Sequence, residues 1–242
     1  MLRSPAVAGQ FYPANPSILE KEVSSYTKEV KRENALGVIS PHAGYIYSGK
    51  VAGGVYSGIN IPKYVIIIGP NHTGLGEPEA VMCAGTWQMP NGNIEINSDL
   101  AGAIVENSKY LKDDHLAHLN EHSLEVQIPF LQRFRKDIRI VPIAMMSMDY
   151  AICQDIGHAV ARAVKSFKEP VLIVASSDMT HYESDKTARE KDKKAIDRVL
   201  ALDPEGLLKT VRENRITMCG VIPATIMLIA CKELGAKKAE LA

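Results

Sequence analysis

Three histidines of this sequence each follow a short apolar run, an arrangement that could bring their side chains together. His42 and His72 come a few residues after two such runs, and Asp178 and His181 follow a third. Neutral imidazole is the commonest metal ligand and also exchanges protons near neutral pH. A single histidine in such a position is more often a hydrogen-bonded loop residue, but three in equivalent positions favour one shared site.

Cys219 is the one cysteine whose surroundings indicate chemistry. It lies at the predicted entry to the last helix, where the helix dipole and free backbone N–H groups stabilise a thiolate. One thiolate with two neutral imidazoles is a suitable ligand set for iron, copper or zinc. The other cysteines are widely spaced and form no CxxC pair, so we predict reduced, structural thiols at Cys83, Cys153 and Cys231.

A second polar group lies between residues 115 and 122. It contains Glu121 and His122, with His115 and His118 close by in the sequence. All four side chains could line the same pocket as the histidines above. A solvated loop explains His115 and His118 equally well, and the residues alone leave both alternatives open.

Two further motifs resemble active-site patterns but lack a required element. Residues 44–50 (GYIYSGK) fit the start of a phosphate-binding P-loop, but Val51 follows and cannot ligate magnesium. Ser176 and Ser177, with His181 nearby, suggest a serine hydrolase, yet the sequence contains no G-x-S-x-G motif. We therefore favour neither interpretation.

Strand-like and helix-like segments alternate along the chain, which predicts a layered α/β domain. Buried strands are expected at residues 36–39, 64–68, 139–145 and 171–175, and a hairpin at 80–96. Helices are expected at residues 15–30, 47–57, 98–107, 123–131, 149–167, 184–202, from 203 onwards and at 221–235. Pro142 is expected at a sheet edge or bulge, and Pro129 predicts a kink or a late helix start. Ligands of open α/β sheets bind outside the carboxyl ends of strands, so the histidines should meet at one edge.

The composition sets limits on partners and location. Lys and Arg together number 28, as do Asp and Glu, so no basic field exists for nucleic acid or an anionic membrane. No apolar run approaches a membrane-spanning length, and residues 1–12 do not resemble a signal peptide. We expect a soluble, cytoplasmic protein with a single domain over residues 1–242.

Six motifs, met in order along the chain, resemble those of the Memo family, whose microbial members are called AmmeMemoRadiSam system protein B. They lie at residues 5–13 (PAVAGQFYP), 40–45 (SPHAGY), 69–72 (GPNH), 121–125 (EHSLE), 176–181 (SSDMTH) and 218–220 (MCG). The resemblance runs from near Arg3 to about Gly235. It implies a fold similar to class III (LigB-like) extradiol dioxygenases, with three α/β/α layers around a mixed, largely parallel central sheet.

The resemblance also implies a ligand set for one metal ion. His42, His72 and Cys219 match the metal ligands of the Memo family, and iron is the expected metal, with copper or zinc as alternatives. Dioxygenases of this fold hold non-haem iron with two histidines and a glutamate. The cysteine departs from that pattern, so ring-cleaving activity is not implied.

Other positions of the resemblance imply roles around the metal. His181 matches the acid/base histidine of the dioxygenases, and Asp178 lies beside it in the same motif. Glu121 and His122 are expected to line the pocket.

These assignments imply a metal-binding protein with redox or oxygen-dependent chemistry on an unknown substrate. One alternative is a non-catalytic adaptor module whose pocket holds a peptide or small anion, and a second is a zinc-dependent hydrolase. A small molecule or peptide is the expected partner, and a homo-oligomer is a further expectation. Family members usually continue into another strand, so we expect that the C-terminal strand region is missing and that a partner chain covers an exposed sheet edge.

Overall fold

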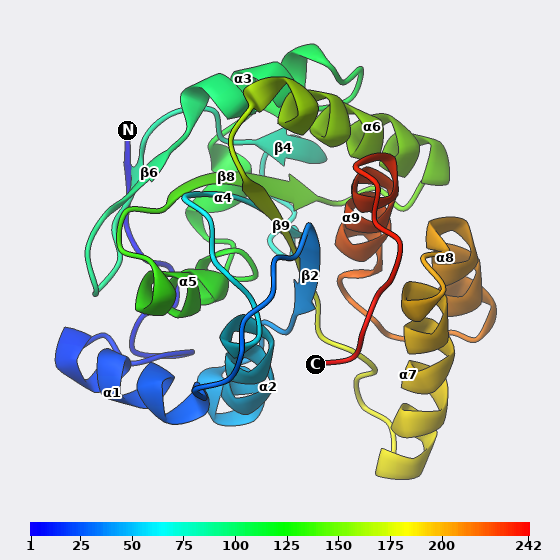
Figure 1. Ribbon diagram of the computed structural model, residues 1–242, viewed down its shortest axis with the longest axis horizontal. Helices are drawn as coiled ribbons and strands as arrows, with labels where there is room; N and C mark the ends of the chain where they lie inside the picture. The colour runs from blue at the N-terminus through cyan, green and yellow to red at the C-terminus, as the bar shows by residue number, and fades with distance from the viewer.

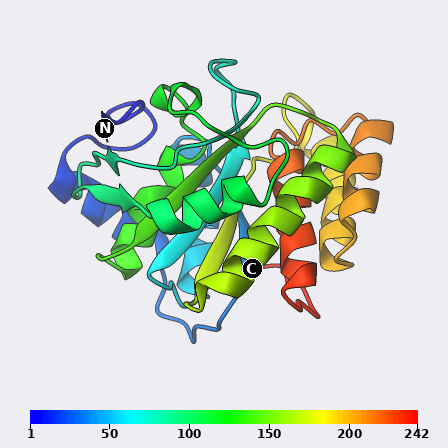
Figure 2. The ribbon, with the colours of Figure 1, turned by 90° about the horizontal axis from the view of Figure 1, so that it is seen from above.

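The computed structural model describes residues 1–242 and contains one nine-stranded sheet with helices on both faces (Figures 1 and 2). The strands are β1 Leu2–Arg3, β2 Gly37–Ser40, β3 Tyr64–Pro70, β4 Glu79–Val81, β5 Thr86–Trp87, β6 Ile94–Ile96, β7 Lys112–Asp113, β8 Arg139–Met145 and β9 Val171–Ser176. The helices are α1 Pro16–Tyr26, α2 Tyr45–Ser57, α3 Ser98–Glu106, α4 Leu116–Leu119, α5 Ile128–Phe134, α6 Tyr150–Phe167, α7 Asp185–Leu200, α8 Pro204–Glu213 and α9 Val221–Glu233.

The strands that carry the predicted site residues are neighbours in the sheet. β8, β3, β9 and β2 lie side by side in this order and run parallel. β6, β5 and β1 extend the sheet beyond β8, and β4 pairs with β8 in the antiparallel sense, so the sheet is mixed. β3 and β9 are almost wholly buried, as their continuous apolar runs predict for strands covered on both faces.

Alternate residues of β3 point into two separate apolar cores. Ile66 and Ile68 belong to a core shared with α3, α6, α8 and α9, whereas Val65 and Ile67 belong to a core shared with α1, α2 and α5. Figure 1 shows α3, α6 and α9 on one side of the sheet and α1, α2 and α5 on the other. The predicted three-layer α/β/α arrangement is confirmed.

Several helices begin directly after a polar residue that caps them. Asn15, Asp149, Ser184 and Asp203 each accept a hydrogen bond from a backbone N–H in the first turn of α1, α6, α7 and α8, respectively. Such caps satisfy N–H groups that have no partner within the helix. Pro129 lies in the first turn of α5, so it marks a late helix start.

Pro142 lies inside an inner strand, and its predicted edge position is wrong. It pairs with Ile67 in the middle of β8, but on the opposite side the neighbour of β8 changes from β6 at residues 139–140 to β4 at 143–145. The carbonyl of Pro142 faces that side, where it accepts a hydrogen bond from the N–H of Met82 at 3.3 Å. The N–H and C=O of a strand residue face the same side of the strand. The N–H that Pro142 lacks would therefore point to the gap between β6 and β4, where no strand pairs with it.

The hairpin is shorter than predicted, because β5 pairs with β6 while β4 joins β8 and β7.

No helix is both long and apolar enough to cross a membrane. After α9 the remaining residues have no regular secondary structure. The missing C-terminal strand stays a prediction.

Candidate metal centre

The carboxyl ends of β2, β3 and β9 form the edge at which the site lies. Because these strands are parallel neighbours, their ends lie side by side. His42 and His72 follow Ser40 and Pro70, the last residues of β2 and β3, and His181 lies in the loop after β9. The predicted shared edge is therefore present.

Three imidazoles converge at this edge. His42, His72 and His122 each offer a ligand atom, and these atoms all lie within 4.8 Å of one another. The rings of His72 and His122 stack with centroids 4.6 Å apart, and the ring of His42 lies edge-on to both. The Sγ atom of Cys219 lies 3.1 Å from Nε2 of His42. The structure thus gathers four nitrogen or sulfur donors.

His42 is held from two sides and is only 2% exposed. Its backbone N–H donates to Oδ1 of Asp178 at 2.7 Å, and its Nδ1 lies 2.9 Å from Oγ of Ser176. Desolvation by burial outweighs the attraction of Asp178 and lowers the pKa of His42 to about 4. The imidazole is therefore neutral at physiological pH, which is the state that binds metals.

Glu121 orients His72. Its buried carboxylate accepts from the backbone N–H of His72 at 2.5 Å, from Nδ1 of the same residue at 3.0 Å and from the backbone N–H of Ser123 at 2.7 Å. Burial raises the pKa of Glu121, but the hydrogen bonds from His72 and Ser123 outweigh it and leave a pKa of about 2. Hydrogen bonds with Cys219 and Glu121 raise the pKa of His72 to about 10. With Nδ1 facing the carboxylate, Nε2 is directed to the centre.

Cys219 reaches the centre because Gly220 packs directly against the end of β9. A Cβ atom at position 220 would overlap the carbonyl oxygen of Ser176 and the side chain of Ser177. The backbone N–H of Asp178 donates to Sγ of Cys219 at 3.3 Å. Since α9 begins directly after Gly220, the thiol lies next to a helix N-terminus, as the sequence predicts.

The N-terminal segment places His122. The ring of Phe11 packs against the ring of His122 with centroids 4.7 Å apart. Arg3 anchors this segment through a fully buried ion pair with Glu125 at 2.6 Å and donates to the carbonyl of Glu121 at 2.8 Å. The position of His122 thus depends on contacts between distant parts of the chain.

Asp178 and His181 take different positions relative to the centre. Asp178 holds the loop after β2, because its Oδ1 accepts from the N–H groups of His42 and the next residue at 2.7 and 3.2 Å. His181 is fixed to Thr217, since its Nδ1 donates to the Thr217 carbonyl at 2.8 Å and its backbone N–H to the Thr217 hydroxyl at 2.7 Å. Thr217 lines the cavity beside Cys219, so His181 contacts a residue of the cavity wall.

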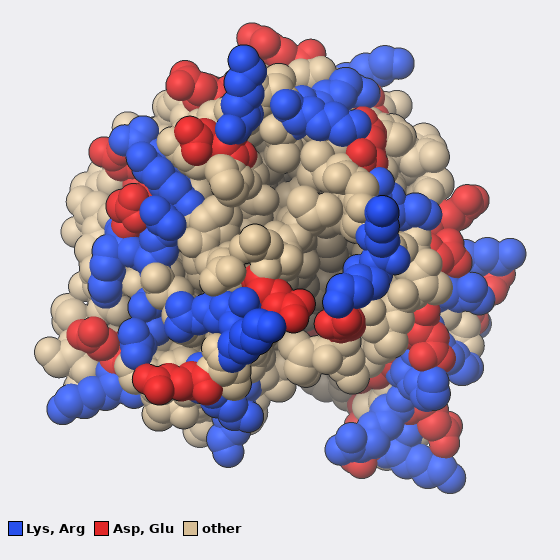
Figure 3. Space-filling model, viewed as in Figure 1, with Lys and Arg blue, Asp and Glu red and all other residues tan.

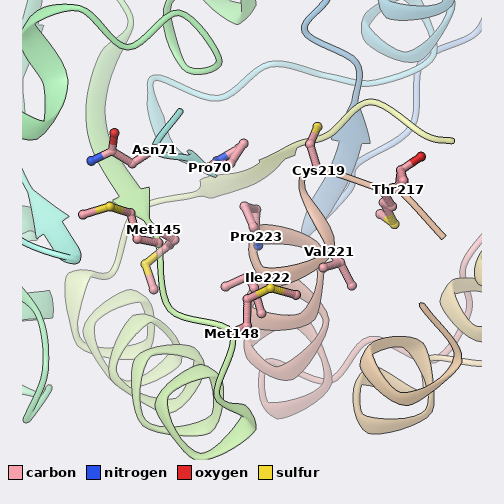
Figure 4. A pocket seen from close by; sticks show the side chains of 11 residues that line it. Pro70, Asn71, Met145, Met148, Thr217, Cys219, Val221, Ile222 and Pro223 are labelled. Carbon is pink, nitrogen blue, oxygen red and sulfur yellow. The ribbon is translucent and has the colours of Figure 1, made fainter. Parts of the chain in front are cut away.

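A cavity of about 520 Å³ adjoins the centre (Figure 4). Pro70, Asn71 and Cys219 lie in its wall, and most of the remaining lining is apolar, including Met145 and Met218. Cavities of this size with apolar walls and a few polar groups are typical of small-ligand sites. On the molecular face in Figure 3, cationic and anionic side chains are interspersed around the hollowed middle.

Nearly the whole sequence matches one family. The family model described as Memo-like protein matches residues 3–242. The chain belongs to the Memo family. A MEMO1 family protein of Methanopyrus kandleri is 40% identical over 256 residues, an alignment that covers 100% of this chain and 90% of the relative. Memo relatives from Nitrosopumilus maritimus and Aquifex aeolicus are each 42% identical, over 252 and 240 residues, covering 100% and 98% of this chain and 91% and 89% of the relatives.

The donor set of this Memo-family chain fits a metal ion. Imidazole and thiolate are ligands that iron, copper and zinc accept. Two of the imidazoles have hydrogen-bonding partners behind them, as ligand histidines commonly do. His42, His72 and Cys219 are the predicted ligands, and His122 also offers a ligand atom within 4.8 Å of those of the two other histidines. Which of the four donors bind the metal stays a prediction.

The sequence does not predict the buried polar residues that support the His42 side of this Memo site. Ser176 and Gln127 form a buried polar contact next to His42. The only signal for Gln127 is a polar residue in a largely apolar segment. His118 belongs neither to the pocket nor to a solvated loop, because it is fully buried and both ring nitrogens face backbone carbonyls.

Proposed function

We propose that this chain binds a single metal ion between His42, His72 and Cys219, with His122 as a further ligand. The observation that supports the proposal is the convergence of imidazole donors within 4.8 Å, beside a cavity at the carboxyl edge of the sheet. We propose iron as the metal, with copper and zinc as alternatives, because imidazole and thiolate suit all three.

The residues around this centre have distinct tasks in the proposal. A bound metal would supply redox or oxygen-dependent chemistry at the coordination positions that the protein leaves open. Glu121 orients His72, and Asp178 holds the loop that carries His42. His181 donates its Nδ1 proton to the Thr217 carbonyl, so its Nε2 is the atom that can accept a proton from a ligand in the pocket. The adjoining cavity would hold the organic substrate.

The metal content of protein purified without oxygen or chelator tests this proposal. We expect about one metal ion per chain in the wild type and its loss in His42→Ala and His72→Ala. His158→Ala is the matched control, because His158 lies on the exposed surface of α6 and pairs with Glu233. Full metal content in either of the first two variants would refute the proposal. Iron or copper would favour redox chemistry, and zinc would favour the hydrolase.

A non-catalytic binding module is the second candidate, and the cavity is the observation that favours it. A cavity of about 520 Å³ can hold a peptide side chain or a small anion without turnover. This candidate predicts that chelator-treated protein binds such a ligand as tightly as untreated protein. A loss of ligand binding on metal removal would count against it.

A further inference from the structure

A fully buried polar chain lies behind His42, on the side away from the other ligands. Its members are Ser176 at the end of β9, Gln127 before α5 and the backbone carbonyl of Ser123, and all three residues are 0% exposed. Buried polar groups of this kind need complete hydrogen bonding, so each proton in the chain has a defined place.

Tyr56 and Pro41 determine the orientation of the Gln127 amide. The Tyr56 hydroxyl donates to Oε1 of Gln127 at 2.8 Å, and Nε2 donates to the carbonyl of Pro41 at 2.9 Å. A flipped amide would place two oxygens against each other at Pro41. Nε2 of Gln127 therefore faces Oγ of Ser176, to which it donates at 2.7 Å.

The Ser176 hydroxyl can then only accept a hydrogen bond from His42. It donates its only proton to the carbonyl of Ser123 at 2.6 Å and accepts from Gln127. Its second lone pair faces Nδ1 of His42 at 2.9 Å, so Nδ1 must carry a proton to complete the contact. Nε2 of His42 is then left without a proton, and this nitrogen faces Sγ of Cys219 at 3.1 Å.

We propose that Ser176 is a positioning residue that fixes His42 in the tautomer protonated at Nδ1, so that Nε2 is the atom that binds the metal. The metal-binding part of this inference rests on the proposed function, whereas the tautomer is a property of the metal-free protein. The two ligand histidines are thus oriented by different groups, a neutral hydroxyl behind His42 and the Glu121 carboxylate behind His72. Outer partners of this kind typically change metal affinity 10–100-fold when removed.

Two serines at the same level of neighbouring strands offer a matched comparison. Ser40 of β2 pairs in register with Ser176 of β9 and is equally buried, but Nδ1 of His42 faces the Ser176 hydroxyl and not that of Ser40. With Zn²⁺ as the probe, Ser176→Ala should weaken binding about 10–100-fold, and Ser40→Ala should leave it within about twofold. Ser176→Thr, which keeps the hydroxyl, should restore most of the affinity. Equal affinities of the Ser176→Ala and Ser40→Ala variants would overturn the proposal.

The tautomer itself can be measured in the metal-free wild type, whether or not any variant folds. Nitrogen-15 NMR of the imidazole rings should show His42 protonated at Nδ1 and bare at Nε2. In Ser176→Ala this preference should weaken, while in Ser40→Ala it should persist. A wild-type His42 protonated at Nε2 would overturn the assignment. Failure of the wild type to bind Zn²⁺ would instead refute the proposed function, and the NMR result would still decide the tautomer.

Discussion

The pH dependence of metal binding should report a proton held by His72. Hydrogen bonds with Cys219 and Glu121 raise the pKa of His72 to about 10, so His72 holds a proton at neutral pH. A metal that binds Nε2 of His72 must displace this proton. Burial lowers the pKa of His42 to about 4, so His42 releases none.

The size of the pH effect on Zn²⁺ affinity follows from these pKa values. While His72 is protonated, each pH unit should change the apparent affinity for Zn²⁺ about tenfold, which amounts to about 100-fold between pH 7 and 9. His72 should contribute about one of the protons that leave the protein for each ion bound. With its ordinary pKa of 6.5, His72 would be almost fully deprotonated at pH 8 and would contribute no such rise.

The variant Glu121→Gln tests how far the pKa of His72 is raised above its ordinary value. The substitution removes the negative charge behind His72 but keeps an oxygen facing its Nδ1. The pKa of His72 should therefore fall by the part that Glu121 contributes, while the larger contribution of Cys219 remains, and proton release at pH 8 should fall with it. Glu95→Gln is the control, because Glu95 is an exposed carboxylate paired with Arg139.

Calorimetric titration of the metal-free proteins with Zn²⁺ at pH 8 counts the released protons. Each titration is repeated in two buffers of different ionisation enthalpy, and the difference in heat gives the number of protons. The wild type and Glu95→Gln should release equal numbers of protons, and Glu121→Gln fewer. Equal release from all three proteins, or no release from the wild type, would contradict a raised pKa of His72.

Three further predictions concern the thiol, acid stability and helix packing. Cys219→Ala should lower Zn²⁺ affinity at least about tenfold with an unchanged melting temperature, because it removes one ligand but little core contact; unchanged affinity would make Cys219 a bystander. Metal-free protein should lose stability as pH falls from about 6.5 to about 4, because the buried His42 and His118 take up protons in this range only when the chain is unfolded. Each of the two histidines should lower the free energy of unfolding by up to about 1.4 kcal/mol per pH unit. A flat urea-unfolding free energy across this range would contradict that. Gly53→Ala should cost about 1–3 kcal/mol, since its Cβ would overlap the backbone carbonyl at the end of α1. Gly54→Ala, with open space around its Cβ, should stabilise α2 by up to about 1 kcal/mol, and similar effects of the two would be the wrong outcome.

The sequence predicts the elements and the site edge because both depend on local pattern. The run at residues 64–68 is apolar at every position, and the structure buries β3 between two cores. Three such strands followed by histidines are sufficient to predict a common edge once the strands are parallel. Capping residues such as Asn15 and Asp149 place helix starts within a residue or two.

The parts that escaped prediction depend on contacts between distant segments. The sequence predicts His122 as a pocket residue, but its place in the histidine cluster depends on the contact with Phe11, which no local periodicity reveals. Pro142 is tolerated in an inner strand only because β6 ends and β4 begins beside it, and strand order is not visible in the sequence. The role of Gln127 follows from the same kind of distant contact, through Ser176.

X-ray absorption of the metal-loaded protein tests the proposed site at His42, His72 and Cys219, because it counts the ligands of the metal. For the zinc form we expect imidazole nitrogens at about 2.0–2.1 Å and one sulfur at about 2.3 Å. Cys219→Ala should remove the sulfur signal and keep the imidazole signal, and His72→Ala should reduce the imidazole signal. Ligation by oxygen atoms alone, or a sulfur signal that survives Cys219→Ala, would contradict metal binding by these residues.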